Sequence, residues 1–105
     1  MRISFVMTAV AVIATFSVTA QAGNPLAGKD VWQKHSCPSC HGLDGKAVVP
    51  GVPHFRMGER MMKPDGALVE TIINGADIMP AWKGILSQKE MFDVVTYIRT
   101  LRKHR

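Results

Sequence analysis

Apolar residues recur at helical spacing in three stretches of the chain, which predicts three main helices. The first stretch covers residues 26–36 and places Val31 and Trp32 on one face. Gly28 lies four residues before Trp32, and a glycine there allows another helix to approach closely. A glycine that is only a weak point near the start of the helix is the alternative, and this pair of residues alone does not decide between the two.

The second stretch follows Pro64-Asp65-Gly66, where Asp65 is the expected N-cap, and it ends before Gly75. Its apolar stripe is formed by Leu68, Val69, Ile72 and Ile73. A stripe of this kind, bounded by a cap and a glycine, predicts an amphipathic helix with one buried face.

The third stretch begins with the capping box of Ser87 and Glu90 and runs to about Arg102. Its apolar positions are Met91, Val94, Val95, Tyr97, Ile98 and Leu101. We expect this helix to cross the first one, with Val94 and Tyr97 over Gly28 and Trp32. Its basic C-terminal end complements the helix dipole and is expected to be solvated.

The N-terminus has the pattern of a secretory signal peptide. Arg2 supplies a positive charge, residues 3–18 are mostly apolar, and Ala20-Gln21-Ala22 fits the A-x-A cleavage pattern. We place the cut directly after this motif, so residues 1–22 are the predicted signal peptide and residues 23–105 the predicted domain. An uncleaved membrane anchor is the alternative, but the apolar run is short for a spanning helix. We therefore expect no stable membrane insertion.

The predicted mature chain has 83 residues, too few for a large core, so a covalently bound group would help to stabilise it. The formal net charge of +5 falls to +4 once Arg2 is removed. This mild bias favours an acidic partner surface. Basic and aromatic residues are not interleaved as in a nucleic-acid platform, so we expect no nucleic-acid binding.

The residues with distinctive chemistry concentrate in Cys37-Pro38-Ser39-Cys40-His41. Side chains at i, i+3 and i+4 share one helical face, so Cys37, Cys40 and His41 can all point at one flat object. C-x-x-C-H is the attachment signature of haem c. In this interpretation the two thiols form thioethers with the vinyl groups, and the imidazole of His41 binds the iron.

Three other interpretations of the two cysteines are a thioredoxin-like redox pair, half of a zinc site and a small structural disulfide. A redox pair is expected near a βαβ pattern, and no convincing strand run surrounds this motif. A zinc site needs further ligands, and the chain has no further cysteine. The motif therefore favours haem c, whose oxidisable thiols suit a periplasm-like compartment rather than a reducing cytosol.

Met79 is the predicted second axial ligand, 38 residues after His41. A thioether is a soft ligand that binds haem iron in electron-transfer cytochromes and raises the reduction potential. Met79 follows a turn and precedes Pro80 and Trp82, which predicts a rigid loop. A space-filling core methionine is the alternative. The rival methionines are Met57, Met61, Met62 and Met91.

Pro50 and Pro53 preclude a regular helix and predict an extended loop against the haem edge. A metal-ligating histidine usually donates its other ring N–H to a carbonyl. We expect the carbonyl of Pro53, or failing that of Pro50, to accept this hydrogen bond from His41.

Three further residues are candidate haem contacts. Arg56 and Arg60 could bind the haem propionates, since guanidinium groups suit carboxylates. A solvated basic loop is an equally good interpretation of both. Trp82 is expected to pack near a propionate rather than to carry electrons.

Together these features resemble a small bacterial class I cytochrome c over nearly all of residues 26–102. The resemblance rests on Gly28 with Trp32, Cys37-Pro38-Ser39-Cys40-His41-Gly42, the proline loop, Asn74-Gly75, Met79-Pro80-Ala81-Trp82 and Tyr97-Ile98 in the closing helix. It implies an all-α cytochrome c fold, with three main helices around one covalently attached haem c and with His41 and Met79 as axial ligands. Residues 56–63, rich in methionine and arginine, have no counterpart in the family.

The predicted function is that of a periplasmic monohaem cytochrome that carries single electrons between redox partners and is not an enzyme. We expect a monomer in which Lys34, Lys46 and Lys83 present a basic ring to an acidic redox partner. One alternative is a haem-based enzyme or gas sensor with an open iron site, where His54 could compete for the iron. Another is a dedicated electron-donor subunit of one oxidoreductase complex, which the sequence does not distinguish from a general carrier.

Overall fold

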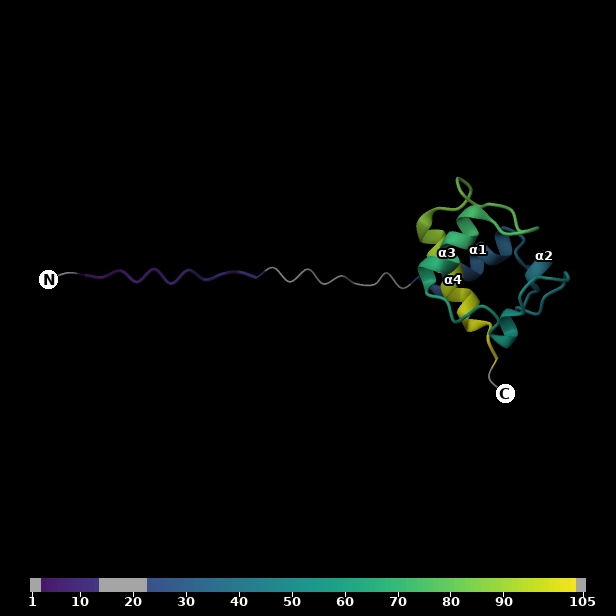
Figure 1. Ribbon diagram of the computed structural model, residues 1–105, viewed down its shortest axis with the longest axis horizontal. Helices are drawn as coiled ribbons and strands as arrows, with labels where there is room; N and C mark the ends of the chain where they lie inside the picture. Colours follow the sequence, from purple (N-terminus) through teal and green to yellow (C-terminus); the bar gives the residue numbers. More distant parts are fainter. Residues whose placement is uncertain (1–2, 14–22, 104–105) are drawn as a thin grey trace.

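The computed structural model describes residues 3–13 and 23–103. Its helical elements in chain order are α1 (Pro25–Lys34), α2 (Pro38–His41), the 3-10 helix η1 (Phe55–Met57), α3 (Asp65–Asn74) and α4 (Gln88–Thr100). Among the described residues there is no β-strand, only two isolated bridges between residues 76 and 86. Figure 1 shows the helices gathered in one domain, with α2 at its edge and α3 on the opposite side. The all-α prediction with three main helices is confirmed.

The N-terminal segment, residues 3–13, has no regular secondary structure and extends away from the helical domain with exposed side chains (Figure 1). The predicted cleavage motif at 20–22 lies outside the described residues, so the signal peptide and the domain boundary stay predictions. No helix in the described part of the chain combines the length and the apolar character that crossing a membrane requires.

Helices α1 and α4 cross in close contact at Gly28. A Cβ added to Gly28 would overlap the carbonyl oxygen of Asp93 and would lie 2.9 Å from the Cβ of Tyr97. The ring of Tyr97 also packs edge-on against Trp32, with 5.8 Å between the ring centroids. The predicted crossing is confirmed, although Asp93 rather than Val94 brings its backbone nearest to the glycine.

The predicted N-cap of α3 is wrong. Pro64 occupies the N-cap position and makes no side-chain hydrogen bond, and Asp65 is the first residue of the helix. The carboxylate of Asp65 instead accepts a hydrogen bond from Arg99 Nε at 2.6 Å. A contact across 34 residues therefore replaces the local cap. The end of α3 is as predicted, because Gly75 has a φ of 74° that stops the helix.

Helix α4 begins as predicted. Glu90 N–H donates to Ser87 Oγ at 3.1 Å, and Ser87 N–H donates to Glu90 Oε1 at 3.0 Å. One turn later Asp93 is only 3% exposed, and it accepts hydrogen bonds from Asn24 N and Lys89 Nζ, both at 2.8 Å. Burial by itself raises the pKa of Asp93, but these two bonds outweigh it and hold the pKa below its usual value. The ionised carboxylate thus fastens the start of α1 to α4.

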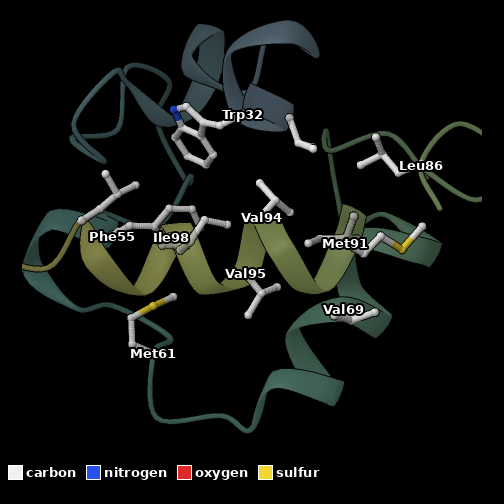
Figure 2. Packing of buried hydrophobic residues seen from close by; sticks show 12 residues of the cluster. Trp32, Phe55, Met61, Val69, Leu86, Met91, Val94, Val95 and Ile98 are labelled. Atoms are coloured by element: carbon white, nitrogen blue, oxygen red, sulfur yellow. The ribbon is translucent and has the colours of Figure 1, made fainter. Parts of the chain in front are cut away.

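The hydrophobic core lies on both sides of α4 (Figure 2). Trp32 of α1 and Val94 occupy one side, and Val95 points to the other side, where Val69 of α3 and Met61 lie. Val95 is 0% exposed and Trp32 1%, so these two positions mark the centre of the packing. Helix α4 is therefore the element against which the others are assembled.

Candidate haem-binding site

Helix α2 carries the C-x-x-C-H motif and presents it to the interior of the domain. After α1 the chain turns at Ser36, which has a φ of 60°, and the Cys37 N–H donates to the carbonyl of Trp32 at 3.2 Å. This turn brings Cys37, Cys40 and His41 to the same cavity. The motif therefore has the arrangement that the sequence predicted.

The cavity has a volume of about 390 Å³ and is bounded by all the α-helices. Its remaining walls come from residues 35–37 and 51–53, from Phe55, from the turn at 60–63 and from the segment between α3 and α4. Most of these side chains are aliphatic or aromatic, with a few polar groups among them. A large apolar cavity with few polar groups is typical of a cofactor site.

His41 lies half-buried beside this cavity. Its ring stacks on Phe55, with 4.7 Å between centroids and 14° between planes, and lies 5.6 Å from Trp32. Burial lowers the pKa of His41, which favours the neutral imidazole that metal binding needs. The predicted hydrogen bond to Pro53 is not formed, since Nδ1 is buried without a partner while the ring lies flat on Phe55. Pro53 itself lines the cavity.

Both cysteines are half-buried free thiols. Burial raises the pKa of Cys37, so this residue stays a thiol near neutral pH. A thioether forms from a thiol and a vinyl group, so a protonated Cys37 is compatible with haem attachment. In the described residues no three His, Cys, Asp or Glu side chains come together in a way that could hold a metal ion. The described residues therefore offer no set of ligands for a zinc ion.

Met79 lies on a short loop that folds back onto the end of α3. Ala76 and Met79 exchange two backbone hydrogen bonds of 2.8 and 3.1 Å, and Trp82 N–H donates to the carbonyl of Ile72 at 3.0 Å. A Cβ at Gly75 would lie only 2.6 Å from the carbonyl oxygen of Met79, so the glycine lets the loop close. Met79 is half-buried and lines the cavity, as does Trp82.

The rival methionines occupy different places. Met57 and Met62 are 64% and 91% exposed, and neither lines the cavity. Met91 is buried in the core but is also not part of the lining. Met61 is 8% exposed and does line the cavity. The structure thus leaves Met61 and Met79 as the two methionines within the site.

Of the two arginines predicted to contact haem, only one lies at the cavity. Arg60 lines the cavity, together with Lys63. Arg56 does not, because its guanidinium pairs with Asp44 at a second hollow on the surface. His54 lies at the same second hollow, where its Nδ1 accepts a hydrogen bond from the Ala47 N–H at 3.0 Å. The structure therefore brings neither Arg56 nor His54 to the cavity.

Backbone strain also gathers at the cavity. Three non-glycine residues in the described part of the chain have positive φ, namely Ser36 at 60°, Arg60 at 60° and Asp77 at 52°. All three line the cavity. Such conformations cost about 1–2 kcal/mol each and persist mainly at ligand clamps and active sites.

The sequence did not reveal two features of the site. The indole N–H of Trp32, at the cavity, is buried without a partner, as is His41 Nδ1. Arg99, expected to be solvated, donates hydrogen bonds to Asp65 and to the carbonyls of Met61 and Lys63. The helical pattern gave no signal for Arg99, because its partners lie 34 to 38 residues away.

Comparison with known proteins decides the family. A family model described as "Cytochrome C oxidase, cbb3-type, subunit III" matches residues 23–98. Cytochrome c6 of Euglena viridis is 32% identical over 71 residues, which cover 61% of this chain and 78% of that protein. The chain belongs to the class I cytochromes c. This cytochrome c binds haem c covalently and is an electron carrier.

The site of this cytochrome c fits haem c. The two thiols, a half-buried imidazole whose pKa is lowered by burial and two methionines line one apolar cavity. Buried polar groups nearly always have hydrogen-bond partners, so the orphaned N–H of Trp32 fits a cofactor that brings its own acceptors. When bound, haem c supplies an iron that takes up and releases one electron.

Proposed function

We propose that this cytochrome c is a periplasmic monohaem carrier of single electrons whose iron is held by His41 and Met79. The observation that carries the proposal is that the C-x-x-C-H motif and Met79, on segments 38 residues apart, line the same cavity. His41 offers the nitrogen ligand and Met79 the sulfur. With these two residues as ligands, the protein would leave no place on the iron for substrates or gases.

Several residues that line the cavity have separate roles in holding haem. Cys37 and Cys40 would each hold the haem through a thioether, in which the S–H has added across a vinyl group with sulfur on one carbon and hydrogen on the other. Arg60 lines the cavity and offers a cation to a propionate carboxylate. Pro53 and Trp82 pack against the ring edge. Arg56 has no part in this arrangement, because it binds Asp44.

Optical spectra test the ligand set. A purified carrier with His/Met ligation gives a low-spin spectrum, has a weak long-wavelength sulfur-to-iron band when oxidised, and does not respond to carbon monoxide when reduced. A high-spin spectrum that shifts with carbon monoxide would establish an open iron instead and would favour an enzyme or gas sensor. A low-spin spectrum without the sulfur band would refute Met79 as the ligand.

The periplasmic location is supported by the N-terminal pattern of Arg2, an apolar run and Ala20-Gln21-Ala22. A mass spectrum of the protein from its native host tests the location and the haem count together. We expect residues 23–105 plus one haem. A chain that retains residues 1–22 would support the anchored alternative.

A dedicated subunit is a second candidate, because the matching family is described as an oxidase subunit. It differs from a free carrier in having one fixed partner. Haem staining of a native gel of detergent-solubilised cells separates the two candidates. A free carrier migrates alone at the size of one chain, whereas a subunit migrates with a large complex.

The free carrier is expected to work as a monomer with acidic redox partners. Lys34, Lys46 and Lys83 are all exposed. Lys34 and Lys83 adjoin His35 and Trp82, which line the cavity. Positive charge beside the cavity attracts an anionic partner surface and speeds encounter at low salt.

A further inference from the structure

Arg99 makes an unusual set of contacts for a residue in the last turn of a helix. Its Nε donates to Asp65 Oδ1 at 2.6 Å, its Nη1 to the Met61 carbonyl at 2.8 Å, and its Nη2 to the Lys63 carbonyl at 2.7 Å. The side chain is only 32% exposed. One planar guanidinium thus fixes three points along a five-residue stretch of a distant segment, which a lysine cannot do.

The segment that Arg99 holds is one wall of the haem cavity. Arg60, Met61 and Lys63 all line the cavity. Met61 contributes a buried apolar side chain, and Arg60 and Lys63 contribute two cations. Arg60 keeps its side chain there despite a φ of 60°, a conformation that costs free energy in any residue with a Cβ. The turn therefore has to be held in place by contacts outside itself.

Neighbouring contacts join the same segment to the end of α4. Lys103 N–H donates to the carbonyl of Arg56 at 3.0 Å. The side chain of Arg102 lies so close to Gly58 that an added Cβ would be 2.9 Å from its Nε. Arg99 is the contact nearest to the cavity, since its acceptors include the backbone of two lining residues.

We propose that Arg99 is a positioning residue that raises the reduction potential by holding Arg60, Met61 and Lys63 against the haem cavity. The inference rests on the proposed function as an electron carrier. Two nearby cations disfavour the extra positive charge of ferric iron, and an apolar wall that excludes water has the same effect. Arg60 and Lys63 line the cavity from exposed positions, so release of the wall lets both cations move away from it and lets water approach, and both effects lower the potential.

The test is the midpoint potential of the haem-loaded protein carrying Arg99→Lys, measured against a fixed redox dye. Because lysine keeps the charge but cannot bind all three acceptors, a change in potential cannot come from lost charge. We expect the equilibrium constant for reduction to fall about tenfold, which corresponds to ~59 mV for one electron. Arg56→Gln is the control, since it removes a cation from the same segment outside the cavity. It should shift the potential far less.

A double-mutant cycle asks whether Arg99 acts through the two cations. In a background of Arg60→Gln with Lys63→Gln, the Arg99→Lys substitution should lower the potential by less than half as much as in the wild-type protein. Asp65→Asn removes the one charged acceptor of the three and weakens the hold of Arg99 on the segment, so it should give a smaller shift in the same direction. This variant keeps the two carbonyl contacts of Arg99. It replaces Arg99→Lys as the test if the Arg99 variants fail to incorporate haem.

Four results would overturn the proposal, and the first three concern the potential. They are an unchanged potential in Arg99→Lys and Asp65→Asn, an equal shift in Arg56→Gln, and an undiminished shift in the double-mutant background. Loss of the sulfur-to-iron band in Arg99→Lys would also overturn it, because Arg99 would then act on the axial ligand. Failure of the proposed function is a separate result, since a carbon monoxide response would already be present in the wild-type protein.

Discussion

At the scale of single residues, the choice of axial ligand lies between Met79 and Met61, the two methionines that line the cavity. Met79→His should remove the sulfur-to-iron band and lower the reduction potential. Because axial ligands set haem potentials over ~0.8 V, we expect a fall on the order of 0.2 V. The band is read from the oxidised spectrum and the potential from a redox titration.

Met61→Leu is the matched control for this prediction. Met61 is 8% exposed, and a leucine of similar volume should cost less than about 1.5 kcal/mol of stability while leaving the band in place. If Met61→Leu loses the band and Met79→His keeps it, the assignment of the two methionines is reversed.

Because the pKa of Asp93 is lowered in the folded protein, we expect the stability of the protein to depend on pH. The folded-state pKa of Asp93 is below the usual value of about 3.9, so its stabilising effect is complete above that pH. The effect is lost as the pH falls through the lower folded-state pKa. Asp93→Asn should cost about 1–2 kcal/mol at pH 7 and should reduce the loss of stability on acidification from pH 5 to pH 2.

Urea unfolding of the haem-loaded protein at several pH values measures the effect of Asp93→Asn. Asp30→Asn is the control, because Asp30 is exposed on α1 and takes part in none of the ion pairs among the described residues. Equal pH profiles for the two variants would contradict a specific role of Asp93.

At the scale of elements, the crossing of α1 and α4 depends on Gly28. Gly28→Ala would place a Cβ onto the Asp93 carbonyl, so the helices must separate, at a cost of about 1–3 kcal/mol or more. Gly66→Ala in the first turn of α3 meets no atom within 4 Å and should stabilise by roughly 0.4–1 kcal/mol. Urea unfolding of both variants compares the two substitutions. A similarly small change in the free energy of unfolding of both variants would show that the crossing of α1 and α4 accommodates the added Cβ.

The elements whose signals are local could be predicted from the sequence. The capping box of Ser87 and Glu90, the stop at Gly75 and the haem motif all depend on residues within a few positions of one another. The local backbone then determines the structure almost alone. The close approach at Gly28 was predicted only together with the apolar face of the closing helix, because the glycine alone was also consistent with a weak point near the helix start.

The contacts that depend on tertiary approach could not be predicted. Aspartate is a preferred N-cap residue. Asp65 nevertheless pairs with Arg99, because α4 passes beside the start of α3. Arg56 pairs with Asp44, 12 residues earlier, and does not line the cavity. Arginine side chains are long and find carboxylates across the fold, so their partners follow from the packing of the elements.

At the scale of the whole molecule, the formal charge of +5 matters through where the exposed lysines lie. Lys34 and Lys83 adjoin residues that line the cavity, whereas neither Lys29 nor Lys103 does. If encounter with an anionic partner occurs beside the cavity, reversal of the first pair should slow electron transfer far more than reversal of the second. The total charge changes equally in both variants, so the comparison isolates the position of the charge.

The measurement is the rate at which ferricyanide, a trianion, oxidises the reduced protein at low and high salt. Lys34→Glu with Lys83→Glu should slow this step on the order of tenfold at low salt, because steering by surface charge changes association rates by ~10–10³. Lys29→Glu with Lys103→Glu should change it much less. Above about 0.5 M salt, screening shortens the Debye length to a few ångströms. The oxidation rates of the wild-type protein and both variants should then be the same. Equal slowing in both variants at low salt would mean that net charge, and not a basic ring beside the haem, governs the encounter.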